Sequence, residues 1–255
     1  MSRARCMVAA AAAALLLSAA ASVGAAPVSL AGPEGKPDAI IDLRTAEGVA
    51  LAQGAWRYSD ARLVEVDFNA AGADMRPSGP PIRTHDVEPK AGAGAFDDAG
   101  WEVLDPTSLE ARRGTGRTSF NWYRIAVTVP ERVGAFNPTG ATLVFELVLD
   151  DYAEVWVDGQ LPRPLGQSGG ALVAGFNAPN RVVLERDVRP GQRYQIAIFG
   201  VNGPLSDPPA NYIWIRSASL QFYRPESLPA VGEVVRLDPA LDAIVPAGAR
   251  IEKNS

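Results

Sequence analysis

The feature that most constrains this chain is a series of short apolar runs, each bounded by turn residues. Residues 141–149 read Ala-Thr-Leu-Val-Phe-Glu-Leu-Val-Leu, and residues 153–157 read Ala-Glu-Val-Trp-Val and end at Asp158-Gly159. β-Branched and aromatic residues pack well on a pleated sheet, and Asp-Gly tolerates the positive φ of a hairpin turn. The same pattern recurs at residues 123–129, 180–184, 194–201, 212–216 and 218–223. These runs predict β-strands.

Many short strands between Gly and Pro residues are typical of an antiparallel β-sandwich or barrel. We predict an all-β, antiparallel β-sandwich over residues 26–225, without a long helix. Residues 69–95 are poor in large apolar residues and rich in Pro, Gly and Ala, which predicts a long surface loop. Alternation along the runs predicts a core that contains Ile125, Val127, Leu143, Phe145, Leu147, Val155, Val157, Ile196, Ile198, Ile213 and Ile215.

The first 25 residues have the pattern of a secretory signal peptide. Arg3 and Arg5 precede the Ala- and Leu-rich residues 7–21, and small residues follow at positions 23–25. The apolar stretch is too short and too rich in Ala for a good membrane anchor. We therefore expect cleavage near Ala26, a periplasmic or secreted protein, and no membrane anchor after cleavage.

The cysteine content and the net charge indicate how the chain is stabilised and which partners are unfavourable. Cys6 is the single cysteine and lies in the signal segment, so the mature chain has no disulfide and depends on its apolar core. Cleavage would lower Lys and Arg from 24 to 22 against 29 Asp and Glu, which gives a net charge of −7. A chain this acidic is a poor partner for nucleic acid or for anionic membranes.

One segment matches a hydrolase motif in letters only. Gly166-Gln167-Ser168-Gly169-Gly170 has the Gly-x-Ser-x-Gly spacing of a nucleophile elbow, which requires a strand before the serine and a helix after it. Pro162 and Pro164 precede it, and Gly and Pro residues follow it. A serine nucleophile also needs a base, and the one histidine, His85, lies in the predicted surface loop. We assign no catalytic residue.

Two pairs of carboxylates could help bind a structural calcium ion. Asp97-Asp98 and Asp150-Asp151 supply oxygen ligands, but neither pair has the spaced ligands of an EF-hand loop. Capping of turns by these side chains is the favoured interpretation. We predict no cofactor, with structural calcium as the alternative.

Four residues are candidates for ligand binding. Alternation places Tyr212, Trp214 and Arg216 on one strand face, opposite Ile213 and Ile215. Trp156, between Val155 and Val157, also points away from the predicted core. Trp and Tyr combine an apolar ring face with a polar group, which suits stacking on a sugar. The same face could instead seat a neighbouring domain, or the rings could serve packing alone.

Four segments in order resemble a known family. They are Gly54-x-Trp56-Arg57-Tyr58, Phe96-Asp97-Asp98-Ala99-Gly100-Trp101, Trp122-Tyr123-Arg124, and Ala-Glu-Val-Trp-Val-Asp-Gly at residues 153–159. Together they resemble the galactose-binding-like jelly roll that is the sugar-binding domain of glycoside hydrolase family 2 enzymes. Asp158 stands where that pattern has Asn. The resemblance covers most of residues 50–223 and implies a jelly-roll sandwich.

The end of the sequence has a second resemblance. Residues 226–255 are predicted to be a linker, and residues 235–246 and 249–253 resemble the lead-in to a gluconolactonase-family, regucalcin-like propeller. Residues 202–214 resemble the accessory domain found before such propellers. The family's metal-binding glutamate belongs to a Glu-Gly-Pro motif that would follow Ser255, so none of the family's catalytic or metal residues is transferred to this sequence.

These observations predict an exported, non-catalytic carbohydrate-binding or accessory domain. Its partner would be a saccharide or a gluconolactonase-like protein. Two alternatives stay open: the front part of a sugar-lactone hydrolase without its catalytic propeller, and a purely structural docking domain. Fold alone does not separate them.

Overall fold

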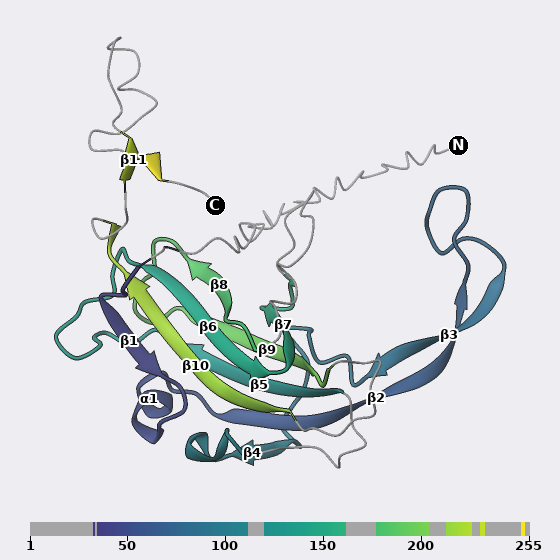
Figure 1. The fold of residues 1–255 in the computed structure, drawn as a ribbon, viewed down its shortest axis with the longest axis horizontal. Helices are drawn as coiled ribbons and strands as arrows, with labels where there is room; N and C mark the ends of the chain where they lie inside the picture. The colour runs from purple at the N-terminus through teal and green to yellow at the C-terminus, as the bar shows by residue number, and fades with distance from the viewer. Residues whose placement is uncertain are drawn as a thin grey trace, which may run out of the picture.

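Two antiparallel β-sheets pack face to face (Figure 1). The structure is a computed structural model that describes residues 33, 35–111, 120–161, 177–203, 213–225, 230–232 and 251–252. One sheet has six strands in the order β3-β2-β5-β9-β7, with β4 beside β2, and the other has four in the order β1-β10-β6-β8. This arrangement confirms the predicted all-β, antiparallel β-sandwich.

The strands of the two sheets from residue 120 onward follow the predicted apolar runs closely, whereas the four strands before it lie outside those runs. The six-stranded sheet contains β2 (Trp56–Asn69), β3 (Pro81–Glu88), β4 (Glu102–Leu104), β5 (Phe120–Thr128), β7 (Tyr152–Val157) and β9 (Arg193–Val201). The four-stranded sheet contains β1 (Ala39–Asp42), β6 (Thr142–Asp150), β8 (Asn180–Glu185) and β10 (Trp214–Tyr223). In the segment predicted to be a linker, β11 (Ala230–Gly232) pairs with β12 (Ile251–Glu252).

The core lies between the two sheets. All eleven residues that alternation predicted to be buried are at most 4% exposed. Trp56 is fully buried among them, and its indole Nε1 donates a hydrogen bond to the carbonyl of Leu43 at 2.8 Å. Burial of apolar area is the main favourable term in a chain without disulfides, so these inward faces stabilise the sandwich.

The turn after β7 forms as expected. Asp158 and Gly159 both have positive φ, 48° and 82°, and Val157 and Gln160 exchange backbone hydrogen bonds across them. Asp and Gly tolerate this conformation better than other residues. The Asp158 carboxylate also accepts a hydrogen bond from the backbone N–H of Gln195 at 2.8 Å.

Strand β10 joins two runs that the sequence separates. The register of β10 against β6 shifts between Ile215 and Ser217. The buried positions change there from Ile213 and Ile215 to Ala218, Leu220 and Phe222. A β-bulge adds one residue to a strand, so it reverses which side chains face the core.

The predicted loop over residues 69–95 is wrong for residues 81–88. These residues form β3, which pairs with β2 from Arg62–Glu88 to Asn69–Pro81 and makes a long two-stranded arm (Figure 1). His85 therefore lies on a strand opposite Glu65 rather than in a loop. Most side chains on both faces of the arm are exposed or half-buried, so neither face imposes the apolar alternation by which a strand is recognised.

The sequence patterns also did not predict a short helix. Helix α1 (Ala46–Leu51) begins after Thr45, whose Oγ1 accepts a hydrogen bond from the N–H of Gly48 at 2.9 Å. A single 3₁₀ turn, η1 (Pro106–Ser108), follows β4. In the described part of the chain, no helix has the length and apolar character needed to cross a membrane. Residues 1–25, the segment around Ser168 and Tyr212 lie outside the described residues.

Candidate ligand-binding site

The outer face of the six-stranded sheet carries a second apolar cluster, separate from the core. Three of its aromatic members are Trp122 on β5, Phe199 on β9 and Trp156 on β7. They point outward because their chain neighbours Tyr123, Ile198 and Val155 point into the core. The rings of Trp122 and Phe199 lie 4.9 Å apart with an interplanar angle of 48°. We call Trp122, Phe199 and Trp156 the outer aromatic cluster.

Residues 89–96, which we call the roof loop, cover part of this cluster. The Trp122 Nε1 donates a hydrogen bond to the Pro89 carbonyl at 2.8 Å. Gly92 lies so close to Trp156 that a Cβ atom there would be 2.7 Å from the ring atom Cδ2. Only glycine fits at this distance, so the sequence of the loop determines how closely it approaches the ring.

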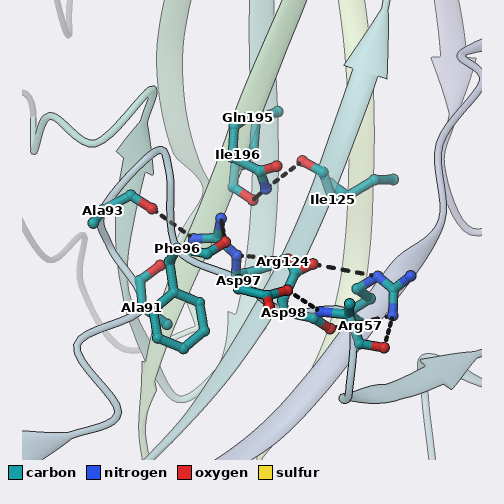
Figure 2. A network of polar contacts seen from close by, with 11 residues as sticks. Arg57, Ala91, Ala93, Phe96, Asp97, Asp98, Arg124, Ile125, Gln195 and Ile196 are labelled. Carbon is teal, nitrogen blue, oxygen red and sulfur yellow. Dashed lines mark hydrogen bonds and ion pairs between the residues drawn. The ribbon is translucent and has the colours of Figure 1, made fainter.

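A buried arginine holds the roof loop in place (Figure 2). Arg124, on β5, is 1% exposed, and its Nε forms an ion pair with Asp98 Oδ2 at 2.7 Å. Its Nη1 donates hydrogen bonds to the carbonyls of Ala91 and Ala93, and Nη2 donates to that of Phe96 at 3.5 Å. A guanidinium group has five N–H donors in a fixed plane, which suits it to several carbonyls and a carboxylate at once.

The carboxylate of Asp98 joins residues from three of the four sequence segments noted above. Asp98 belongs to the Phe-Asp-Asp segment and Arg124 to the Trp-Tyr-Arg segment, and the ion pair joins them. Arg57, from the Trp-Arg-Tyr segment, also reaches Asp98, with Nε 3.4 Å from Oδ1. Three of the four motifs therefore meet at one carboxylate. Of these residues, Arg124 also bonds directly to the roof loop.

A cavity of about 500 Å³ opens beside the roof loop, above the outer aromatic cluster. Cavities of this size are common for small-molecule sites. Its walls combine the three aromatic rings with three charged side chains. The lining residues are Asp86, Val87, Pro89, Lys90, Gly92, Ala93, Trp122, Glu154, Trp156, Gly159 and Phe199.

The charged groups of this cavity have distinct partners. Lys90 forms an ion pair with Asp86, and this pair holds the pKa of Asp86 below its usual value. Glu154 lies on β7, and its Oε2 accepts a hydrogen bond from the Trp156 indole Nε1 at 3.3 Å. The cavity thus offers carboxylate acceptors and an ammonium donor above apolar rings.

A second cavity of about 790 Å³ adjoins the first and shares Pro89 and Lys90 with it. Asp60 in its wall accepts a hydrogen bond from the Tyr58 hydroxyl at 2.6 Å. Burial, together with Asp60, raises the pKa of Tyr58, so the phenol keeps its proton and acts as the donor. The other lining residues are Ala61, Arg62, Glu88 and Phe96.

The three predicted site residues that the structure describes lie on two different sheets. Trp156 lies on the six-stranded sheet, whereas Trp214 and Arg216 lie on β10 of the four-stranded sheet. The guanidinium of Arg216 lies 5.2 Å from the centre of the Trp214 ring, and its Nη2 forms an ion pair with Asp150 Oδ1 at 2.8 Å. Arg216 is therefore already engaged by a carboxylate and a ring.

Carboxylates of both pairs considered for calcium have partners within the protein. Asp98 is bound by Arg124 and Asp150 by Arg216. Asp151 Oδ2 accepts a hydrogen bond from the N–H of Gly203 at 2.9 Å, and burial raises the pKa of Asp151. Within the described ranges, no three His, Cys, Asp or Glu side chains cluster as metal ligands would.

Comparisons with known proteins give similarity in structure but not in sequence. No protein-family model matches the chain, and no curated protein gives a significant match. A glycoside hydrolase family 2 member from Bacteroides cellulosilyticus aligns with 73% of this chain and 21% of its own, at 14% identity and a TM-score of 0.42. A calcium-binding mutant of Bacteroides uniformis β-glucuronidase 2 aligns with 67% of this chain and 17% of its own, at 15% identity and a TM-score of 0.39.

A Faecalibacterium prausnitzii β-glucuronidase gives a third alignment. It covers 76% of this chain and 33% of the β-glucuronidase, at 16% identity and a TM-score of 0.33. The chain thus spans a third or less of the length of these three proteins. It resembles a portion of family 2 glycosidases.

Proposed function

We propose that this chain is an exported, non-catalytic carbohydrate-binding domain whose ligand site is the cavity above the outer aromatic cluster. The observation that carries the proposal is the combination of Trp122, Trp156 and Phe199 with Glu154 and the Asp86–Lys90 pair around one cavity. A sugar has an apolar face of C–H groups and a rim of hydroxyl groups. Aromatic rings suit the first, and charged hydrogen-bonding groups suit the second.

The site is also held in place before any ligand arrives. Trp122 is tied to Pro89, and Arg124 fixes the roof loop through Asp98 and three carbonyls. Pre-organisation lowers the conformational entropy that the site itself loses when a ligand binds. Water competes for every sugar hydroxyl, so we expect dissociation constants on the order of millimolar to tens of micromolar, roughly −4 to −7 kcal/mol.

Titration of a panel of soluble glycans into the chain from Ala26 onward tests this proposal, with calorimetry or chemical-shift changes as the readout. Trp156→Ala should reduce affinity at least tenfold because the ring forms part of the cavity wall. Trp214→Ala is the matched control, since it removes a partly exposed Trp from the other sheet, and it should leave affinity unchanged.

The opposite pattern would contradict the proposal. If Trp214→Ala abolished glycan binding and Trp156→Ala did not, the ligand site would lie on β10. If no glycan bound but a co-expressed gluconolactonase-like propeller co-purified with the chain, the domain would be a docking domain.

A further inference from the structure

We propose that the cavity selects sugars that carry a free, protonated amino group. This inference rests on the proposed function and adds the chemical class of the ligand. It begins from Glu154, whose carboxylate lies in the cavity wall and accepts a hydrogen bond from the Trp156 indole. No ion pair joins Glu154 to a cation among the described residues.

The other two charges in the cavity neutralise each other. Asp86 and Lys90 form an ion pair, and the pKa of Asp86 is lowered chiefly by that lysine. The pair leaves Glu154 as the excess charge, so the described cavity wall carries a net charge of −1. In the adjoining cavity, Arg62 forms an ion pair with Glu88, and Asp60 accepts a hydrogen bond from the Tyr58 hydroxyl. Asp60 adds a second negative charge there, so the lining of both cavities favours a cation.

The aromatic rings favour a cation at the same place. The face of an indole or phenyl ring attracts an ammonium group, most strongly where water is partly excluded. Trp122 is 5% exposed and Phe199 is 8% exposed, so these rings lie in a largely dry wall. Glu154 is their cross-strand neighbour, because Trp122 pairs with Phe199 and Phe199 pairs with Glu154. An ammonium group between them would meet both a carboxylate and ring faces.

The charge of the whole chain acts in the same direction. Its formal net charge is −5, which attracts a polycationic glycan and repels a polyanionic one. A uronic acid would bring its own carboxylate toward Glu154, which is unfavourable at short range. The geometry therefore ranks amino sugars first, neutral sugars second and uronic acids last.

The test compares four oligosaccharides of equal length at pH 5.5, where the amines are protonated. They are β-1,4-linked glucosamine, its N-acetylated form, the neutral glucose oligomer and an oligouronate. We expect the free amino sugar to bind about fivefold more tightly than the neutral oligomer, as for a partly exposed ion pair. Raising the salt concentration should weaken this preference.

Glu154→Gln separates the effect of the Glu154 charge from the effect of the chain's net charge. It keeps a hydrogen-bonding group of the same shape and removes the charge, so affinity for the amino sugar should fall more than affinity for the neutral sugar, and the amino-sugar preference should drop toward onefold. Glu65→Gln is the control, because it removes the same charge from the exposed arm and should keep the preference.

The remaining outcomes test the role of Glu154 and the proposed function separately. Equal binding of amino and neutral sugars by the unaltered protein, or an equal loss of preference in both variants, overturns the role of Glu154 and leaves the proposed function standing. Absence of binding by all four oligosaccharides and by the wider glycan panel overturns both.

Discussion

Two aromatic surfaces of this molecule differ in what lies around them. On the six-stranded sheet, the outer aromatic cluster is partly covered by the roof loop, and a cavity of about 500 Å³ remains beside it. On the four-stranded sheet, Trp214 is partly exposed, with the Arg216 guanidinium 5.2 Å from its ring centre. Both surfaces arise from strand alternation, so a Trp on an outward face does not by itself make a site.

The difference lies in how each arginine is used. Arg124 is buried, and it connects a strand to a loop through one carboxylate and three carbonyls. The side chain of Arg216 is 46% exposed and contacts Asp150 and the ring beside it. A buried cation that organises a loop builds a concave surface, whereas an exposed cation on a ring leaves the strand face open.

The largest expected effect on stability comes from removing the contacts that Arg124 makes with Asp98 and the roof loop. Arg124→Met keeps much of the side chain's volume but leaves Asp98 and the carbonyls of Ala91 and Ala93 without this donor. Removing one partner of a buried ion pair costs about 3–5 kcal/mol. Chemical denaturation should show a decrease of that size in the free energy of unfolding, and glycan binding should be lost.

Arg83→Met is the control for this experiment. Arg83 lies on the arm, is 64% exposed, and forms ion pairs at 3.5 Å with Glu65 and Asp67. Exposed pairs contribute about 0–1 kcal/mol, so its stability should barely change. Similar losses in the two variants would show that Arg124 has no special role in holding the roof loop.

A smaller effect is expected where the roof loop touches the cluster. Gly92→Ala would place a Cβ atom 2.7–3.0 Å from three atoms of the Trp156 ring, so either the loop or the ring must move. Overpacking of this kind costs about 1–3 kcal/mol. Ligand affinity should fall together with stability, as measured by calorimetry on the folded variant.

Gly100→Ala provides the comparison, since no atom lies within 4 Å of the Cβ it would add. Its stability and ligand affinity should match those of the unaltered protein. If Gly92→Ala behaved like Gly100→Ala, the close approach of the roof loop to Trp156 would not matter for the site.

Sequence patterns predicted the central part of the sandwich because apolar side chains there alternate regularly into the core. Along β5 and β9, Ile125, Val127, Ile196 and Ile198 alternate inward, and each is buried as expected. The arm was missed because its strands bury neither face. The remaining sequence signal is that the two segments carry complementary side chains. In the structure, Arg83 lies opposite Asp67 and His85 opposite Glu65.

The site was only partly predictable. Trp156 was identified as an outward aromatic residue, but Trp122, Phe199 and Glu154 were not. The same alternation could have indicated Trp122 and Phe199, because they flank the core residues Tyr123 and Ile198. The roof loop could not be found in this way, since its position depends on Arg124 bonding to residues 26–33 positions earlier in the chain.

The smallest effect concerns a buried carboxylate at the end of the four-stranded sheet, next to Asp150. Burial raises the pKa of Asp151, so the fold disfavours the ionised form of this carboxyl. The unfolded chain holds this carboxyl at its ordinary, lower pKa. The resulting destabilisation is therefore complete above the raised pKa, shrinks as the pH falls from the raised toward the ordinary pKa, and is absent below both.

Asp151→Asn removes the charge and keeps an oxygen that can accept the hydrogen bond from the Gly203 N–H. We expect a small increase in melting temperature at pH 7, which shrinks as the pH is lowered. The cavity on the other sheet should bind its ligand as before, because the substitution leaves the roof loop unchanged. A decrease in melting temperature at pH 7, or a gain that grows toward acid pH, would mean that the fold favours the ionised form of Asp151.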